Sequence, residues 1–395
     1  MKVRVADNGA FIELLAGGKP EKIRTPAFVY DEGSVLGAVN RLKSIAENLG
    51  CKLLFSLKAL SLVDALRLMV PSVDGFAASS LFEASLAREV LRNNGTVHLT
   101  SPALRDDELD VLAGLCDYVS FNSLPQWERC QPVVGRGASC GLRVNPQLSF
   151  VEDDRYNPCR KHSKLGVPLD ALRPLLASGD GKLRGLRGLH FHSNCESDSL
   201  EPLLETVRHL DASVGNFFND LEWVNLGGGY EYGDGSSHGA LHEAVDLLRR
   251  KYGVEVFIEP GEAVVGRSAC IVSSVVDLFD SEGKEVAVLD TTVNHVPQVY
   301  EYQYRPEVAG ATRPGGYRYI LAGATCLAGD LFGEYGFDAP LAVGSRVIFE
   351  RTGAYALARA HMFNGINLPD VYALTAGGEV TLKKRFTYQD YISRW

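Results

Sequence analysis

The sequence lacks any long apolar run, and it has no excess of basic residues. No stretch of about 18 consecutive apolar residues occurs, which argues against a membrane-spanning helix. Asp7 and Glu13 interrupt the first apolar stretch, so we do not expect a secretory signal either. The formal net charge of −9 argues against nucleic acid or an anionic membrane surface as a partner.

Paired cysteine motifs are also absent. The eight cysteines stand at positions 51, 116, 130, 140, 159, 195, 270 and 326, and they form neither a CxxC motif nor a zinc-like cluster. We therefore expect reduced thiols in a cytoplasmic protein, and no metal site. The GxGxxG fingerprint is missing as well, which argues against a nicotinamide dinucleotide as cofactor.

The composition that remains is that of an ordinary globular protein. The 395 residues are 46% hydrophobic and 23% charged. These values exclude intrinsic disorder, collagen and a simple coiled coil. A chain of this length is expected to form two domains, or one large domain with an appendage.

Strand-like and helix-like segments alternate along the first two thirds of the chain. Eight short runs read as buried strands: 52–57, 73–77, 97–100, 118–122, 141–144, 188–192, 222–225 and 254–259. Helical spacing lies between most of them, for example in 62–70, 80–91, 200–210 and 240–252, and Ser79 or Ser80 is suited to cap the second of these helices. The repeat predicts an α/β fold, a (β/α)8 barrel, with a doubly wound open sheet as the alternative.

The pattern changes after Glu262, where valine, tyrosine and glycine dominate and helical spacing is rare. Antiparallel strands are expected in 263–276, 285–289, 317–322 and 345–350, and strands also in the first 30 residues, which contain KVRVADNGAFIEL. We therefore predict a barrel domain over residues 30–262. Residues 1–29 and 263–395 are predicted to form a second, β-rich domain.

Lys58 follows the first expected barrel strand, in the segment LLFSLKAL. Barrel enzymes place their chemistry at the carboxyl ends of the strands. Burial lowers the pKa of a lysine, and a neutral amine at that place is a nucleophile suited to forming a Schiff base. The alternative is a strand-end lysine that simply reaches solvent.

His190 and His192 stand in LHFHSNCE, and in a strand their side chains would point to the same face. No acidic or cysteine partner is spaced to complete a metal site with them. Stacking on a flat ring is one use for such a histidine, and packing in the core is the other.

Gly227, Gly228 and Gly229 follow a strand in NLGGGY. Glycines let backbone N–H groups approach an anion closely, and the start of a following helix would add positive potential. A phosphate cradle is therefore one interpretation, and a tight loop that ends the strand is the other.

Three further loops carry groups with chemistry. Glu259 and Glu262 stand in IEPGE at the last strand end, where proline and glycine hold the carboxylates rigidly. Cys326 and Asp330 stand in ATCLAGD; the thiol is a workable proton donor, and the alternative is a small buried apolar residue. Tyr355, in GAY, offers a hydroxyl for phosphate.

These segments, in this order, resemble the fold-type III pyridoxal-phosphate enzymes, the alanine racemase-like barrel group. Within it they are most similar to the carboxynorspermidine/carboxyspermidine decarboxylases, because TCLAGD occurs together with IEPGEA. The matching segments span nearly the whole chain: TPAFVYD (25–31), LLFSLKA (53–59), FAASSLFE (76–83), LHFH…CE (189–196), WVNLGGGY (223–230), IEPGEA (258–263), YRP (304–306), TCLAGD (325–330) and TGAYA (352–356).

The resemblance implies pyridoxal 5′-phosphate as cofactor and gives each motif a role. Lys58 would bind the cofactor covalently, and His192 would stack on its ring. Gly227–Gly229 and Tyr355 would bind its phosphate. Glu259 would pair with the pyridine nitrogen and keep it protonated, which makes the ring a stronger electron sink. Alanine racemases have an arginine there, so Glu259 favours a decarboxylase.

The resemblance also implies a homodimer with shared active sites. Cys326 and Asp330 would reach into the site of a partner subunit, where Cys326 would protonate the α-carbon. Glu262 and Asp330 would face the substrate, a small-molecule L-amino acid with a long amine-bearing substituent.

Two departures from the subfamily pattern affect specificity. Gln298 stands where the subfamily has an aspartate that resembles a contact to the distal amine of the substrate, and Ser193 and Asn194 replace apolar residues. The first leaves open a paralogous decarboxylase acting on another aminocarboxypropyl-bearing metabolite. A non-catalytic cofactor-binding homologue is an alternative of another class.

Overall fold

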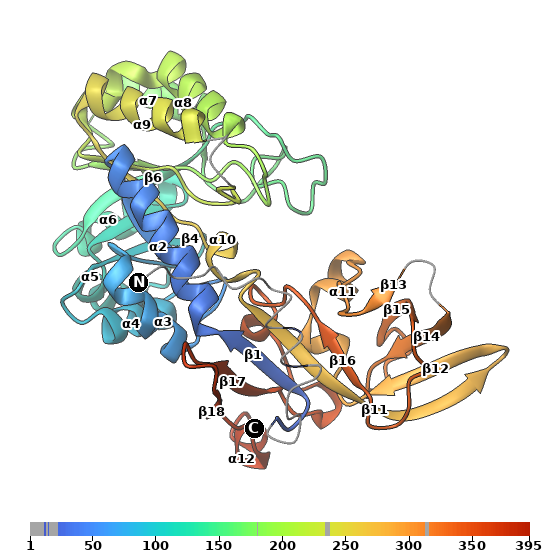
Figure 1. Ribbon diagram of the computed structural model, residues 1–395. Helices are drawn as coiled ribbons and strands as arrows, with labels where there is room; N and C mark the ends of the chain where they lie inside the picture. Colours follow the sequence, from blue (N-terminus) through green and yellow to red (C-terminus); the bar gives the residue numbers. More distant parts are fainter. Residues whose placement is uncertain (1–11, 13–14, 16–22, 180, 234–237, 313–315) are drawn as a thin grey trace. The chain divides into compact units, whose positions relative to one another are not determined.

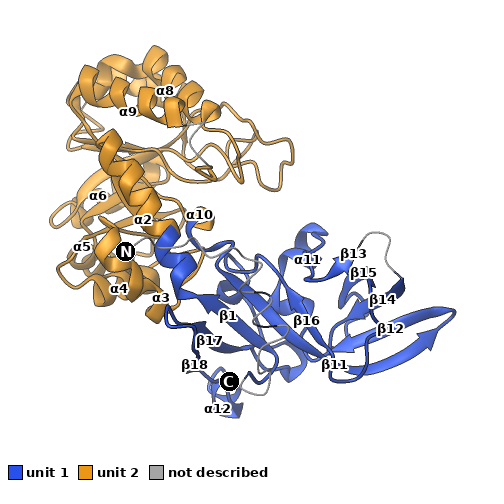
Figure 2. Ribbon diagram, viewed as in Figure 1, with its two compact units in different colours: residues 1–37, 264–395 blue, residues 38–263 orange. Residues whose placement is uncertain are grey.

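The computed structural model describes residues 12, 15, 23–179, 181–233, 238–312 and 316–395 (Figure 1). The chain divides into two compact units, drawn in different colours in Figure 2. Residues 38–263 form the first, called the barrel unit below. Residues 1–37 and 264–395 form the second, called the sheet unit.

The barrel unit alternates strands and helices. Its elements in chain order are α2 (Glu32–Leu49, which begins in the sheet unit), β2 (Lys52–Ser56), α3 (Val63–Met69), β3 (Gly75–Ala78), α4 (Leu81–Leu91), β4 (Thr96–Ser101), α5 (Leu109–Leu115), β5 (Tyr118–Phe121), α6 (Leu124–Val134), β6 (Ser139–Asn145), β7 (Val167–Pro168), α7 (Leu169–Ser178), β8 (Gly188–His190), α8 (Glu201–Val214), β9 (Trp223–Asn225), α9 (His238–Tyr252), β10 (Glu255–Ile258) and α10 (Glu262–Val265, which ends in the sheet unit). A helix follows each of the first seven barrel strands before the next one begins.

Eight parallel strands close into a barrel. They pair in the order β2, β3, β4, β5, β6, β8, β9 and β10, and β10 pairs again with β2. The predicted (β/α)8 barrel is confirmed. The open doubly wound sheet is wrong, because an open sheet would leave β5 and β6 as unpaired edges instead of joining them.

Large side chains fill the barrel interior near the amino ends of the strands. Trp223 packs with Leu54 and Phe257, which come from different strands. Gly141 and Gly188 make room for it, since a Cβ at either position would lie within 2.5 Å of the Trp223 ring. The barrel interior is therefore closely packed around Trp223.

Capping explains one helix start that the sequence predicted. Ser80 is the N-cap of α4, and its side chain accepts a hydrogen bond from the backbone N–H of Glu83 at 3.2 Å. The Glu83 carboxylate in turn accepts from the N–H of Ser79 at 2.7 Å. The first bond satisfies a donor that the first helical turn leaves free, and the second fixes the residue before the N-cap.

The sheet unit holds one large sheet with short helices. Its elements are β1 (Ala27–Asp31), β11 (Ala269–Ser281), β12 (Lys284–Leu289), α11 (Gln298–Tyr302), β13 (Ala311–Thr312), β14 (Tyr317–Ala322), β15 (Leu331–Phe337), β16 (Arg346–Phe349), β17 (Asp370–Leu374), β18 (Val380–Lys384) and α12 (Tyr388–Ile392). The sheet order is β13-β15-β14-β12-β11-β1-β17-β18, with β16 also paired to β11. The second β-rich domain built from both ends of the chain is thus confirmed as part of the fold.

The expectation that this sheet is antiparallel was wrong in part. β1 pairs with β17 in parallel, and so does β12 with β14. Each parallel pair joins strands separated by a long crossover, which short-range alternation cannot reveal. Most of the strand expected in KVRVADNGAFIEL lies outside the described residues, and Ile12 within it has helical backbone.

Within the described part of the chain, no helix is long and apolar enough to cross a membrane.

Candidate active site

Lys58 lies just beyond the carboxyl end of β2, in a turn. The N–H of Ser56 donates to the carbonyl of Pro260 at 3.1 Å, which ties this turn to the loop that carries Glu259. The Lys58 side chain is accessible to solvent yet closely surrounded by protein atoms. Burial lowers its pKa, although the Glu259 carboxylate opposes the shift. The amine is therefore more easily freed of its proton than that of a surface lysine.

Glu259 is held by two donors at the carboxyl end of β10. Its Oε1 lies 3.2 Å from Nε2 of His190, and its Oε2 accepts from the Asn225 amide at 3.0 Å. Burial alone would raise the Glu259 pKa, but His190 and the Lys58 ammonium outweigh it, and the pKa lies far below its usual range. Glu259 is thus an ionised carboxylate, only 9% exposed.

His192 is oriented by the glycine loop. Its Nδ1 accepts a hydrogen bond from the N–H of Gly228 at 3.1 Å, so the remaining proton of the neutral ring is on Nε2. Burial and the nearby Lys58 hold the His192 pKa well below its ordinary value. The ring is therefore neutral and fixed in direction, whereas His190 is bonded to Glu259 and packed in the core.

The three glycines are required by close backbone approach. A Cβ on Gly227 would lie 2.4 Å from the carbonyl oxygen of Phe191, and one on Gly228 would lie 2.4 Å from that of Glu259. Gly227 and Gly229 also have φ values of 72° and 90°, which favour glycine. The glycine loop is therefore held in close contact with the backbone at Phe191 and Glu259.

Some of the backbone N–H groups that were expected to bind phosphate already donate to other residues. The N–H of Gly227 donates to Asn225 at 2.8 Å, and that of Gly228 donates to His192. Two of the three glycine amides thus have partners inside the barrel unit. The next helix in the described residues, α9, spans His238–Tyr252.

Two polar residues of this site were missed in the sequence. Asn225 links Gly227 to Glu259 through two hydrogen bonds. The charge of Arg143, on β6, acts on Glu259, Lys58 and His192. Burial lowers the pKa of the Arg143 guanidinium. A signal existed for both: each is a polar residue in a mostly apolar strand, GLRVN and WVN.

The remaining barrel residue singled out by the sequence, Glu262, opens α10 one turn beyond Glu259 and is half-buried. Cys195 lies near it: burial raises the Cys195 thiol pKa to about 11, and the negative charges of Glu196 and Glu262 add to the rise. The structure thus brings Lys58, His192, Glu259 and Glu262 to one end of the barrel unit, together with the glycine loop.

The other predicted residues lie in the sheet unit. All eight cysteines are among the described residues and are free thiols, and Cys326 alone of them is exposed. Its N–H donates to the side-chain carbonyl of Asn364 at 3.0 Å. The alternative of a small buried apolar residue is therefore wrong for Cys326.

Asp330 is buried, with 2% of its surface exposed, and its carboxylate accepts bonds from its own unit. Oδ1 accepts from the N–H of Val293 at 2.8 Å, and Oδ2 accepts from the N–H and the hydroxyl of Thr325 at 2.9 and 2.5 Å. Within the sheet unit the side chain therefore supports the Cys326 loop, and its role at the substrate stays a prediction.

Gln298 and Tyr355 lie close together in the sheet unit. The amide nitrogen of Gln298 donates to the carbonyl of Ala354 at 3.4 Å, while its Oε1 is buried with no hydrogen-bond partner among the described groups. Tyr355 is half-buried and has φ 60°, a left-handed conformation uncommon for a tyrosine. Such strain occurs most often at functional sites.

The sequence departures Ser193 and Asn194 are explained by local pairing. The Ser193 hydroxyl lies 3.1 Å from that of Thr206 on α8, so one polar group is matched by another. The side-chain oxygen of Asn194 accepts from the N–H of Cys195, and its carbonyl lies against Gly229. Both side chains are buried, and their polarity is satisfied within the barrel unit.

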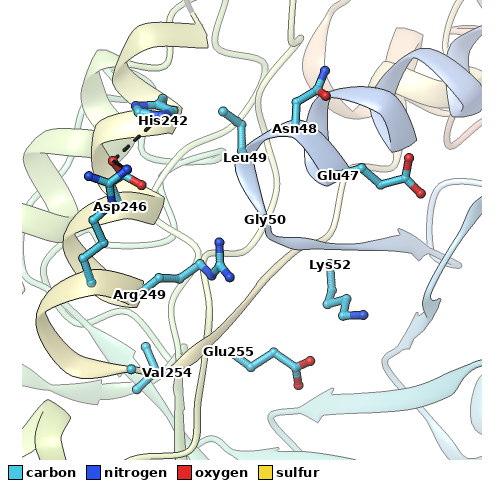
Figure 3. A pocket seen from close by; sticks show the side chains of 12 residues that line it. Glu47, Asn48, Leu49, Gly50, Lys52, His242, Asp246, Arg249, Val254 and Glu255 are labelled. Atoms are coloured by element: carbon cyan, nitrogen blue, oxygen red, sulfur yellow. Dashed lines mark ion pairs between the residues drawn. The ribbon is translucent and has the colours of Figure 1, made fainter.

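A separate pocket of about 790 Å³ lies at the amino ends of β2 and β10 (Figure 3). Its charges balance: Glu47, Asp246 and Glu255 face Lys52, Arg249 and Arg250. This end of a barrel contributes to stability rather than to chemistry. Among the described residues, no group of His, Cys, Asp or Glu is arranged to hold a metal ion.

Comparison with known proteins identifies the barrel unit. The family described as "Pyridoxal-dependent decarboxylase, pyridoxal binding domain" matches residues 37–266, more than half of the chain. The chain belongs to this family. It is a pyridoxal-phosphate-dependent decarboxylase, as the resemblance in its motifs implied.

Two relatives match over nearly their full lengths. A carboxynorspermidine/carboxyspermidine decarboxylase of Campylobacter jejuni subsp. jejuni serotype O:6 is 33% identical, over 95% of this chain and 99% of that protein. A carboxyaminopropylagmatine decarboxylase of Synechocystis sp. is also 33% identical, over 97% of this chain and 98% of that protein.

Solved structures confirm the fold. The carboxynorspermidine decarboxylase of Campylobacter jejuni, complexed with norspermidine, superposes with a TM-score of 0.84 at 32% identity, covering 94% of this chain and 100% of that one. The diaminopimelate decarboxylase of Helicobacter pylori, complexed with L-lysine, has a TM-score of 0.80 over 97% of this chain and 98% of that one; at 19% identity it supports the fold alone.

The residues of the decarboxylase fit its cofactor. Lys58 supplies an amine with a lowered pKa, and Glu259 supplies a carboxylate held ionised by donors on both oxygens. His192 supplies a half-buried ring of fixed direction. The glycine loop carries no side chain that would block a close approach of its backbone to a phosphate.

Proposed function

We propose that this decarboxylase removes the α-carboxylate from an L-amino acid with a long amine-bearing substituent, of the carboxynorspermidine or carboxyspermidine type, in polyamine biosynthesis. The observation that carries the proposal is the ionised Glu259 next to Lys58 in a chain 33% identical to decarboxylases of such substrates. The test measures CO₂ release from a panel of candidate amino acids. Release from none of the amine-bearing substrates would contradict the proposal.

The roles of the residues follow from their chemistry. When bound, pyridoxal phosphate supplies an electron sink for the pair left at the α-carbon as CO₂ departs. Lys58 would hold the cofactor covalently, because its lowered pKa frees the amine. Glu259 would keep a proton on the ring nitrogen, because a negative charge favours the cation. His192 would stack on the ring. The Gly227–Gly229 loop and Tyr355 would bind the phosphate, and Gly227 and Gly228 would shape this loop, since their N–H groups donate within the barrel unit.

Residues of the sheet unit, together with Glu262, would donate the proton and bind the substrate. Cys326 is the exposed thiol suited to hand a proton to the α-carbon. Glu262 and Gln298 would face the substituent of the substrate. The presence of Lys58, Glu259 and Cys326 together argues against a non-catalytic cofactor-binding homologue.

The active sites are proposed to be shared between two copies of the chain. Residues 30–262 form the cofactor domain in this proposal, and residues 1–29 and 263–395 contribute to the dimer interface. A cytoplasmic location is proposed as well, because all eight cysteines are free thiols.

Mixing two impaired variants tests the shared site. Lys58→Ala subunits alone should be inactive and Cys326→Ala subunits alone should keep only a small residual activity, whereas together they should regain up to about a quarter of wild-type activity, since random pairing gives heterodimers with one intact site. Activity is measured as CO₂ release after subunit exchange has been verified by mass. No recovery after verified exchange would place both residues in one chain's site.

Gln298 supports a second candidate substrate. Its unpartnered Oε1 accepts hydrogen bonds but carries no charge to neutralise a primary ammonium. Another aminocarboxypropyl-bearing metabolite is therefore the alternative, and a relative of equal identity is named for carboxyaminopropylagmatine.

The effect of restoring the charge separates the two candidates. If the native substrate is not carboxynorspermidine, Gln298→Asp should raise kcat/KM for carboxynorspermidine about tenfold to a hundredfold, the effect of a charge-assisted hydrogen bond worth about 1.5–3 kcal/mol. It should lower kcat/KM for the native substrate. Gln298→Glu, which keeps the side-chain length, controls for reach. Efficient wild-type turnover of carboxynorspermidine with no gain in Gln298→Asp would exclude altered specificity.

A further inference from the structure

The loop that carries Cys326 closes on one buried carboxylate. Three bonds to Asp330 begin inside or next to this loop: the Thr325 N–H and hydroxyl donate to its side chain, and the Gly323 N–H donates to its carbonyl at 2.8 Å. The N–H of Asp330 donates back to the carbonyl of Leu327 at 2.9 Å. Cys326 is thus an exposed residue of a turn whose two ends meet at Asp330.

The space for this carboxylate is built into the fold. A Cβ on Gly323 would lie 2.1 Å from Oδ1 of Asp330, so no other residue fits at position 323 without moving the carboxylate. The Thr325 hydroxyl also receives the N–H of Leu327 at 3.4 Å while donating to Asp330. A single hydroxyl therefore connects the carboxylate to both sides of Cys326.

The same carboxylate reaches a second segment. Its Oδ1 accepts from the N–H of Val293, the first residue of a short 3-10 helix, Val293–His295. That helix leads through Pro297 into α11, which begins at Gln298. Asp330 thus connects the loop of Cys326, the proposed proton donor, to the segment of Gln298, which is proposed to contact the substrate. The backbone N–H of Ala324 reinforces the junction by donating to Thr291 at 2.9 Å.

We propose that Asp330 is a positioning residue that fixes the Cys326 thiol relative to the Gln298 segment and acts on the reaction only through this placement. The proposal rests on the proposed role of Cys326 as proton donor. It replaces direct contact between Asp330 and the substrate, since both carboxylate oxygens are used inside the sheet unit and 2% of the residue is exposed.

Thiol alkylation tests the placement without relying on catalysis. The holoenzyme is treated with iodoacetamide, and modification of Cys326 is followed by mass spectrometry. Asp330→Asn puts an amide N–H₂ against a backbone or hydroxyl donor, so the loop should loosen and Cys326 should react about fivefold faster, the scale of one or two lost hydrogen bonds. Asp277→Asn makes the same change at an exposed carboxylate of the sheet unit and should leave the rate unchanged.

Thr325 provides a pair of variants that leave the carboxylate in place. Thr325→Val keeps the shape of the side chain and removes the hydroxyl, so it should reproduce the faster alkylation. Thr325→Ser retains the hydroxyl and should restore the wild-type rate. Equal rates in wild type, Asp330→Asn and Thr325→Val would overturn the proposal.

A double-mutant cycle distinguishes positioning from a separate role. If Asp330 acts through Cys326, Asp330→Asn lowers kcat in the wild-type background and has little further effect in Cys326→Ala. If Asp330→Asn lowers kcat by the same factor in both backgrounds, Asp330 contributes independently of Cys326, and the proposal is contradicted. If Cys326→Ala retains full kcat, the proposed role of Cys326 fails instead, while the alkylation result still reports whether Asp330 places the thiol.

Discussion

The Lys58→Ala variant should lack the long-wavelength absorbance that the purified wild-type enzyme carries, and its decarboxylation should fall at least about a thousandfold, the scale seen when a covalent catalytic residue is removed. Lys58 is the lysine whose pKa burial lowers at the carboxyl end of the barrel strands. Alanine offers no amine to hold the cofactor. Absorbance spectra and CO₂ release measure the two effects, and borohydride treatment followed by peptide mapping locates the lysine that holds the cofactor.

Lys52→Ala is the matched control for this experiment. Lys52 opens the same strand, β2, at its opposite end, where its ammonium lies 3.7 Å from Asp74 and is half-exposed. Removal of that surface charge should change neither the spectrum nor the activity, because exposed ion pairs contribute little. A borohydride-reducible lysine that persists in Lys58→Ala would show that another residue anchors the cofactor.

The barrel was predictable from sequence because its strands are short apolar runs separated by helical spacing. The same pattern is shared by open sheets, so periodicity alone left closure undecided. Closure depends on the pairing of β5 with β6, a contact set by strand tilt around the whole ring rather than by any local segment. The motifs, which resemble those of a family of barrel enzymes, favour the closed barrel over the open sheet where periodicity does not.

The parallel pairs of the sheet unit show what local patterns cannot give. Strand β1 lies between β11 and β17, whose residues stand more than two hundred positions further along the chain. Alternation of side chains predicts that a strand exists, but direction depends on the route of the chain between partners. The presence of a strand was accordingly easier to predict than its direction.

Site residues could be predicted where they stand in a recognisable motif, and they were missed where they lie inside a strand. Lys58 and Glu259 stand in loops next to glycine or proline, where their chemistry is visible in the sequence. Asn225 and Arg143 are polar residues in mostly apolar strands, and only the folded barrel shows that they interact with Glu259. Asp330 is the reverse case: its motif suggested the substrate, while its hydrogen bonds point into its own loop.

The Glu259→Gln variant should keep the cofactor and lose most of its decarboxylation. The change removes the negative charge that would hold a proton on the ring nitrogen, and a charge-assisted bond of about 1.5–3 kcal/mol corresponds to a tenfold to hundredfold loss in turnover. Absorbance after extensive dialysis measures retention of the cofactor, and single-turnover CO₂ release measures the chemical step. Glu255→Gln, at the exposed start of the same strand, is the matched control.

Retention of the cofactor is expected because the neighbours of Glu259 tolerate an amide. Asn225 donates to one oxygen, and the new carbonyl still accepts that bond. The other oxygen faces Nε2 of His190, whose Nδ1 is buried with no hydrogen-bond partner among the described groups. The ring proton can therefore move to Nδ1, which leaves Nε2 to accept from the new N–H₂. The barrel end keeps its shape and loses only the charge, so unchanged turnover in this variant would remove the electron-sink role of Glu259.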